Sequence, residues 1–372
     1  MGLAIVGLLL IGLVALGLNI FLNMKAVGVT PGYGFLVQAA GFDLSESLIP
    51  YDASDSYSRV IVAGLLNTIL LAFVSLVLAT VVGVVMGLVS VTPSPAGRII
   101  AMLYVELFRN LPKILVLLVL YVVAVRGLPA VRQAVSFGPI HLSNRSIYFP
   151  TIEINAAQVW LILPLVLALC LSAYWVHRAR RIQRETGRGT PVLLVVFALL
   201  IALPLGAAFL FQIPMKIDVP QFQRFDFEGG GRLSIQFLVV LVTLGLYHGA
   251  QIAEVVRGGI LAVPTGQVEA GKALGLSPRY VTRLVILPQV LRIVIPPMIN
   301  QYVNLIKNTS IAIAVGYSDL MAVSGTIINQ TFRPLEMMLV TMGLYLGLCL
   351  LASSAMNGLN KRLRARSARS AT

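Results

Sequence analysis

Apolar stretches long enough to cross a bilayer recur along almost the whole chain. A helix needs about 20 apolar residues, at a rise of about 1.5 Å per residue, to span the hydrocarbon core. Stretches of that length lie at residues 2–24, 60–90, 99–125, 156–176, 192–212, 234–256, 286–306 and 335–357. We therefore predict an all-α polytopic membrane protein with about eight transmembrane helices. The even number places both termini on one side.

Basic residues between the apolar stretches predict which side faces the cytoplasm. The loops around residues 178–188, 257–283 and 361–369 are rich in Lys and Arg and fall on the same side. Basic residues in the opposite loops are accompanied by about as many acids. Because cytoplasmic loops carry the basic excess, we expect the first side and both termini to be cytoplasmic.

Two polar segments, residues 25–58 and 213–233, fall on the external side. The first contains GFDLSESLIPYDASDSYSR and the second PQFQRFDFEGGGR. We expect the first to be ordered and the second to return as a short hairpin or loop. Neither is long enough to be a separate domain. They could contact an external binding protein, but we favour the interpretation that they cap the spans.

Composition argues against several other classes of protein. The chain is 58% hydrophobic and 11% charged, whereas soluble proteins average about 25% charged residues. Its net charge of +14 comes from short loops between apolar stretches, which indicates membrane topology and not nucleic-acid binding. Cys170 and Cys349 lie inside apolar runs, so we expect no disulfide and no metal site. The chain lacks H-E-x-x-H and G-x-S-x-G motifs, which disfavours an intramembrane enzyme and leaves no catalytic residue to name.

A polar helix-turn-helix is predicted within residues 264–300, between two long apolar segments. Thr265 is the expected N-cap of a first short helix, and Gly275 is the expected left-handed residue that ends it. Ser277 would then cap a second helix with Pro278 at its first position. An element of this kind at a membrane face is suited to docking a partner outside the bilayer.

The same loop nearly matches a phosphate-binding G-x-x-x-x-G-K-[ST] motif. Gly266, Gly271 and Lys272 fit, but Ala273 stands where a Ser or Thr would bind magnesium, and no strand precedes the loop. We therefore expect no ATP hydrolysis, and no cofactor, on this chain.

The loop resembles the permease subunits of ATP-binding-cassette (ABC) importers. Their pattern reads Glu-Ala-Ala, three residues, Gly, nine residues, Ile, one residue, Leu-Pro. The matching positions here are Glu269, Ala270, Gly271, Gly275, Val285, Leu287 and Pro288, with Gly271 for the second Ala and Val285 for Ile. The resemblance implies that this loop enters a cleft on a separate ATPase subunit, which would hold ATP and Mg.

The resemblance also implies a domain plan. A type I importer core of five spans would use the second, third, sixth, seventh and eighth apolar stretches, with three additional spans. The expected parts are an N-terminal span and periplasmic segment at 1–59, a permease domain at 60–357 with inserted spans at 156–212 and a coupling loop at 259–285, and a basic cytoplasmic tail at 358–372.

The third stretch carries charges at membrane depth. Glu106, Arg109 and Lys113 follow one another at single-turn spacing, so they form one stripe, and Pro112 should bend the helix beside them. Importer permeases for polar amino acids resemble this region in their Glu-x-x-Arg-x-x-Pro sequence. An internal ion pair and a substrate contact are equally good interpretations.

The sixth stretch presents Tyr247, Gln251 and Glu254 on one polar face, which we expect to line an inner cavity. Glu254 is expected to pair with Arg257 at the cytoplasmic mouth. His248 is expected to be a packed or hydrogen-bonded helix residue, not a proton carrier.

Past the loop, Pro288, Pro296 and Pro297 are expected to break the helix. A second break is expected where polar residues follow, near mid-membrane or just outside it. Lys307 could meet a substrate carboxylate or anchor the helix end. The whole candidate translocation path comprises Glu106, Arg109, Gln251, Glu254, Asn300, Asn304, Lys307, Asn308, Thr309 and Ser310.

The run LIKNTSIAIAVGYSDL resembles polar-amino-acid permeases, and the whole layout is similar to the larger permease subunits of general L-amino-acid importers. The expected protein is a bacterial inner-membrane permease for polar L-amino acids. Its expected partners are a cytoplasmic ABC ATPase dimer, a second identical or homologous permease, a periplasmic amino-acid-binding protein and membrane lipid. The alternative is a proton- or ion-coupled carrier that uses Glu106, Glu254 and Lys307, although no inverted repeat is evident.

Overall fold

The computed structural model describes residues 32–152, 160–186, 190–212 and 216–369, with short pieces between residues 7 and 23. The predicted first span at 2–24 therefore lies for the most part outside the described residues. The chain forms two compact units, one made of Met1–Gly127 with Ser234–Thr372, the other of Leu128–Leu233.

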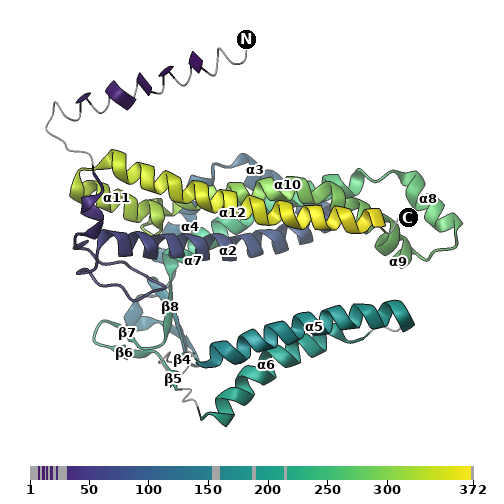
Figure 1. Cartoon of the computed structure of the whole chain (residues 1–372), viewed down its shortest axis with the longest axis horizontal. Helices are drawn as coiled ribbons and strands as arrows, with labels where there is room; N and C mark the ends of the chain where they lie inside the picture. The colour runs from purple at the N-terminus through teal and green to yellow at the C-terminus, as the bar shows by residue number, and fades with distance from the viewer. Residues whose placement is uncertain are drawn as a thin grey trace. The chain divides into compact units, whose positions relative to one another are not determined.

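The first unit is built of helices (Figure 1). They are η1 Gly34–Val37, α2 Tyr57–Ser90, α3 Pro95–Asn110, α4 Lys113–Gly127, α7 Ile235–Leu261, α8 Thr265–Ala273, α9 Pro278–Tyr280, η4 Val281–Ile286, α10 Leu287–Asn308, η5 Thr309–Val315, α11 Leu320–Thr331 and α12 Pro334–Arg369. Here η4 is a π-helical turn and η1 and η5 are 3₁₀-helices. This arrangement confirms the all-helical polytopic prediction for the core.

Six helices of the described residues are long and apolar enough to cross a membrane, or up to seven if the bent pair α3 and α4 forms one span. The predicted count of eight stays a prediction, because the remaining span is the one at 2–24. The stretch predicted at 99–125 bends by 104° at Pro112, as predicted, and the bend divides it into α3 and α4. Pro112 disfavours helical backbone at the preceding residue, and Leu111 is extended, with ψ of 139°.

Serine side chains begin three of these helices. Ser56, Ser94 and Ser234 each accept a hydrogen bond from the backbone N–H three residues later, at the start of α2, α3 and α7. Each bond satisfies a backbone donor that the first helical turn leaves without an intrahelical partner. The start of each of these three helices is therefore set by a serine N-cap, which can be recognised in the sequence.

Helices α2 and α7 pack with their backbones in close contact. A Cβ atom added at Gly83 would lie 2.6 Å from the Ile252 Cβ atom and 2.8 Å from the Gly249 carbonyl oxygen. One turn later, a Cβ atom on Gly87 would lie 2.7 Å from the Val256 Cβ atom. Small residues permit this approach, which membrane helices use because burial from water does not drive their association.

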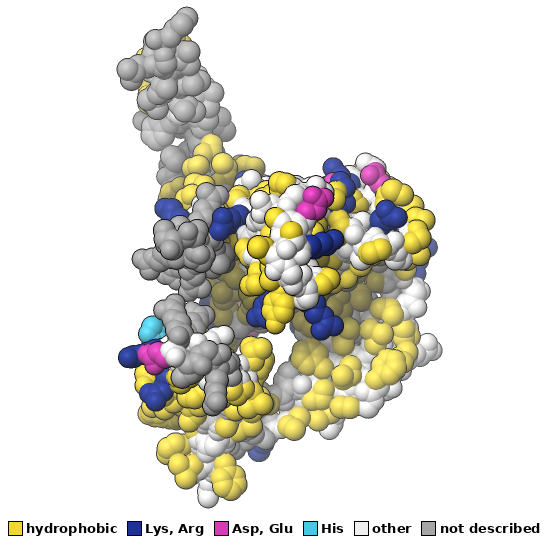
Figure 2. Space-filling view, turned by 90° about the vertical axis from the view of Figure 1, so that its right-hand side faces the viewer, with side chains coloured by type: hydrophobic (Ala, Val, Ile, Leu, Met, Phe, Trp, Pro, Cys, Tyr) yellow, Lys and Arg dark blue, Asp and Glu magenta, His cyan; other side chains and the backbone are white. Residues whose placement is uncertain are grey.

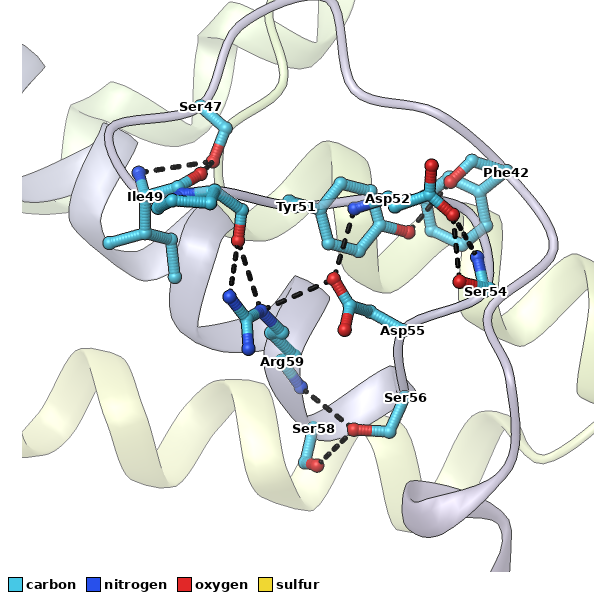
Figure 3. A network of polar contacts seen from close by, with 11 residues as sticks. Phe42, Ser47, Ile49, Tyr51, Asp52, Ser54, Asp55, Ser56, Ser58 and Arg59 are labelled. Atoms are coloured by element: carbon cyan, nitrogen blue, oxygen red, sulfur yellow. Dashed lines mark hydrogen bonds and ion pairs between the residues drawn. The ribbon is translucent and has the colours of Figure 1, made fainter.

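The external segment before α2 is ordered by its own polar contacts (Figure 3). Arg59 donates to the Pro50 carbonyl oxygen at 2.6 and 3.0 Å and pairs with Asp55 at 3.2 Å. The Ser54 amide and hydroxyl donate to the Asp52 carboxylate and lower its pKa. Asn67 of α2 donates to the Glu46 carbonyl oxygen at 2.9 Å. The segment therefore lies against the helices, as the capping interpretation predicts.

The second unit combines the helices α5 Ile162–Thr186 and α6 Val192–Leu210 with short strands. A four-stranded sheet has the order β1-β2-β3-β8, and two further pairs are β4 with β5 and β6 with β7. The strands are β1 Val135–Phe137, β2 Ile140–Leu142, β3 Ser146–Phe149, β4 Thr151–Ile152, β5 Ile217–Asp218, β6 Gln221–Gln223, β7 Asp226–Glu228 and β8 Gly231–Ser234. The hairpin β6–β7 confirms the hairpin predicted within 213–233, whereas β1 to β4 were not predicted.

One hydrogen bond joins the four-stranded sheet to the β6–β7 hairpin. The Tyr148 hydroxyl of β3 donates to the Asp226 carboxylate of β7 at 2.5 Å. Burial, together with this acidic acceptor, raises the pKa of Tyr148 to about 12. The Phe227 ring lies between Tyr148 and His141, with centroid separations of 4.6 and 4.5 Å. Strands that precede and strands that follow the α5–α6 pair in the sequence thus share one aromatic cluster.

The prolines of α10 do not act as predicted. Pro288 lies in the first turn of α10, where its missing N–H costs nothing, but Pro296 and Pro297 lie inside a helix that continues to Asn308. Buried neighbours on α10, including Val294 and Ile299, hold the helix in its packed position. Packing therefore outweighs the two missing backbone bonds.

Replacing Gly83 by Ala should lower the thermal stability of the purified protein in detergent. The added methyl group overlaps Ile252 and the Gly249 carbonyl, and overpacking of this kind costs about 1–3 kcal/mol. The matched control is Gly343→Ala on α12, where an added Cβ meets nothing within 4 Å and helix propensity improves by up to about 1 kcal/mol. Equal melting temperatures for the two variants would contradict the close packing of α2 and α7.

Candidate functional site

The predicted coupling loop forms a short helix, α8, that differs in one detail at its start. Thr265 is the first helical residue and not the N-cap. The N-cap is Pro264, whose ψ of 136° is outside the helical range, and no side chain caps the helix. A proline has its φ already fixed near the value required here, so the turn can begin one residue earlier than predicted.

The end of α8 has the predicted geometry. Gly275 adopts a positive φ of 77°. Its N–H bonds the Lys272 carbonyl at 2.9 Å, and the Leu276 N–H bonds the Gly271 carbonyl at 3.2 Å. These two bonds form a Schellman motif, which satisfies the last carbonyls of the helix. Ser277 then occupies the N-cap position of α9, without a side-chain hydrogen bond.

Gly271 is the buried contact that holds α8 to the chain behind it. A Cβ atom at this position would lie 3.3 Å from Val281 Cγ2 and 3.6 Å from Val285 Cγ2. Both valines belong to the π-helical turn η4, which leads directly into Leu287 and Pro288 at the start of α10. Helix α8 is therefore connected to α10 through its packing on η4.

The opposite side of α8 is exposed. Glu269 and Ala270 both face solvent, and Leu274 is 81% exposed. Figure 2 looks onto the end of the first unit that carries α8 and α9, where dark blue basic side chains lie among yellow hydrophobic ones. An acid, a small residue and a bare leucine on one rigid turn form a surface suited to a protein partner.

Three predicted path residues meet at a cavity of about 370 Å³. Glu106 and Arg109 of α3 line it together with Glu254 of α7. Arg98 and Arg257 add further positive charge to its wall. The cavity therefore has both cationic and anionic groups, and Gln251 is not among its lining residues.

The predicted ion pair between Glu254 and Arg257 is confirmed, with two contacts of 2.6 and 3.0 Å. Glu106 instead accepts a bond from the Asn110 amide at 2.8 Å. Within the described part of the chain, neither Arg98 nor Arg109 has an ion-pair partner. Both guanidinium groups are therefore available to an anionic ligand.

Asn308 belongs to a separate polar cluster. Its amide donates to His248 Nε2 at 3.0 Å, and its oxygen accepts from the Lys113 ammonium at 2.5 Å. His248 is 1% exposed and hydrogen-bonded, as predicted. Lys113 was not included in the predicted path, although its position directly after Pro112 was a usable signal.

The other path residues of α10 lie apart from these groups. Asn300, Asn304 and Lys307 are exposed. Thr309 is buried and bonds the Ile306 carbonyl at 2.8 Å, while Ser310 bonds the Lys307 carbonyl at 2.9 Å. The α-helix ends at Asn308 and continues without interruption as the 3₁₀-helix η5, so the predicted break after Asn308 is a change of helix type and not a break. Among the described residues, no group of three or more His, Cys, Asp or Glu side chains could hold a metal ion.

Replacing Gly275 by Val should loosen the loop without unfolding the protein. A side chain at a φ of 77° costs about 1–2 kcal/mol in the left-handed conformation. We expect trypsin to cleave at Lys272 and Arg279 about tenfold faster in permeabilised membranes. Gly266→Val, at an exposed helical position in the same loop, is the control; equal cleavage rates for the two variants would contradict the Schellman assignment.

Comparison with known proteins places this geometry in a family. The family described as "Binding-protein-dependent transport system inner membrane component" matches residues 181–365. The "Putative amino-acid ABC transporter permease protein YhdX" of Escherichia coli (strain K12) is 39% identical over 347 residues, covering 93% of this chain and 88% of that protein. The "General L-amino acid transport system permease protein AapQ" of Rhizobium johnstonii is 37% identical over 349 residues, covering 93% and 86%.

A third relative is the "Glutamate/glutamine/aspartate/asparagine transport system permease protein BztB" of Rhodobacter capsulatus. It is 36% identical over 394 residues, covering 96% of this chain and 91% of that protein. These matches extend over nearly the full chain and are not confined to the coupling loop. The chain therefore belongs to the family of inner-membrane permease components of binding-protein-dependent ABC importers.

Proposed function

We propose that this chain is the permease subunit of a bacterial importer that carries polar L-amino acids across the inner membrane. In its family, a separate ATPase subunit hydrolyses ATP and a binding protein delivers the substrate. The amino-acid substrate is supported by the names of the relatives, one of which includes glutamate, glutamine, aspartate and asparagine.

The geometry of α8 is the observation that carries the coupling role. The turn leaves Glu269 and Leu274 exposed and packs through Gly271 on η4. A partner that closes on the exposed side would push on η4 and hence on α10. ATP-driven closure of an ATPase dimer would in this way move the permease helices, and hydrolysis would reset them.

A second permease, identical or homologous, is the proposed partner for the exposed polar face of α10. Asn300, Asn304 and Lys307 lie on that face, and polar side chains at membrane depth face protein or a water-filled path. The translocation path would then run between the two permeases. The mixed-charge cavity at Glu106, Arg109 and Glu254 would form its cytoplasmic end, where a zwitterion finds groups of both signs.

The proposed orientation puts α8 in the cytoplasm. Leu274 and Phe137 are 81% and 66% exposed and, by topology, lie on opposite sides of the membrane. In a variant with Cys170 and Cys349 replaced, we expect Leu274→Cys to react with an impermeant maleimide only in inside-out vesicles. Phe137→Cys should react only in right-side-out vesicles, and the reverse pattern would refute the orientation.

Reversing the charge at Glu269 should uncouple transport. In proteoliposomes that hold the permease, ATPase and binding protein, we expect Glu269→Lys to lower both uptake and stimulated ATP hydrolysis at least tenfold. The exposed acid would otherwise meet the ATPase cleft, and the reversed charge repels what the native one attracts. Membrane insertion and yield should not change, because the side chain is exposed.

The control is Glu185→Lys on α5, which reverses an exposed acid that pairs with its neighbour Arg181. Normal uptake by the Glu269 variant would remove the coupling role. Uptake driven by a proton gradient, with no ATPase subunit present, would instead support the ion-coupled carrier.

A further inference from the structure

A break between two helices and a change of helix type meet at half the depth of α7. His248 is the middle residue of this 27-residue helix, so it lies about 20 Å from either end at 1.5 Å per residue. Asn308, the last residue of α10, contacts His248, and Lys113, the first residue of α4 after the 104° break, contacts Asn308. Transporters form substrate sites where helices are broken near the bilayer midplane.

Lys113 places a positive charge at this depth without an acidic partner. No carboxylate of the described residues lies within ion-pair distance of its ammonium. Its contacts are the neutral Asn308 amide and the face of the Tyr247 ring, with 5.3 Å between the ammonium and the ring centroid. A charge inside the bilayer is costly and in membrane proteins marks a functional position.

The neighbours of Lys113 hold its ammonium in place but leave some of its hydrogen-bond donors without an acceptor among the described residues. Asn308 cannot turn its oxygen away, because its amide group is held by the buried His248 ring. An ammonium has three donors, of which Asn308 takes one. The Lys113 side chain is only partly buried, and the N-terminal end of α4 adds a partial positive charge. These groups together favour an anionic group beside the ammonium.

We propose that Lys113 binds the carboxylate of the transported amino acid at the membrane midplane. The inference rests on the proposed function and adds a subsite to it. A carboxylate would supply the counter-charge that the ammonium lacks and would accept its remaining donors. Asn308 and His248 then act as positioning residues that orient the ammonium. The mixed-charge cavity near Glu254 would bind the substrate later, closer to the cytoplasm.

The test measures substrate binding by the permease–ATPase complex in detergent, without binding protein. The probe is whichever of L-glutamate, L-glutamine, L-aspartate and L-asparagine the reconstituted system imports best, together with its α-carboxamide analogue. We expect Lys113→Gln to weaken binding of the amino acid at least tenfold and Lys113→Arg to restore part of it. The carboxamide analogue lacks the carboxylate, so its affinity for the wild-type complex should be as low as the affinity of the amino acid for the Lys113→Gln complex.

Arg126→Gln removes an exposed charge at the far end of α4 and should leave binding unchanged. ATP hydrolysis stimulated by the loaded binding protein should persist in Lys113→Gln, so loss of the subsite is distinguishable from failure of the proposed function. Equal binding by wild type and Lys113→Gln, or no saturable binding by wild type, would overturn the proposal. So would a Lys113-dependent copurification of anionic lipid that the amino acid does not displace, because the site would then hold a lipid phosphate.

Discussion

Backbone polar groups that leave a helix inside a bilayer must find partners within the protein, because lipid offers none. This chain leaves helical geometry in its core between α3 and α4, and after Asn308 it changes from α-helix to the 3₁₀-helix η5. At the break, the Leu111 N–H still bonds the Leu107 carbonyl, and the Leu115 N–H bonds the Pro112 carbonyl. Helix α7 contacts α3, α4 and η5, so its close packing on α2 joins these segments to the rest of the core.

Much of the fold was predictable because it follows from local chemistry. Apolar length predicted the spans, and the single glycine at 275 predicted the end of α8, since few other residues tolerate a φ of 77°. The spacing from Gly271 to Val285 matched the motif, although it did not reveal that Gly271 touches both Val285 and Val281. Local rules thus found the turn of α8, and the structure adds its packing on η4.

The errors have different physical causes. Pro296 and Pro297 were expected to break α10, but the helix continues through them to Asn308 because it is packed against its neighbours. The strands β1 to β3 were missed because each has only three or four residues, too few for a clear alternation. The sheet that they form with β8 joins segments that the α5–α6 pair separates in the sequence. A local sequence pattern cannot predict pairing between strands so far apart in the chain.

The sequence identified the predicted path residues as polar positions but could not divide them into groups. The structure places Glu106, Arg109 and Glu254 at one cavity, Asn308 in a midplane cluster, and Asn300 with Asn304 on an exposed face. Such separation suits transport, because a single deep site that satisfied every charge of a zwitterion would retain it. Stepwise sites, each complementary to part of the solute, allow release at every stage.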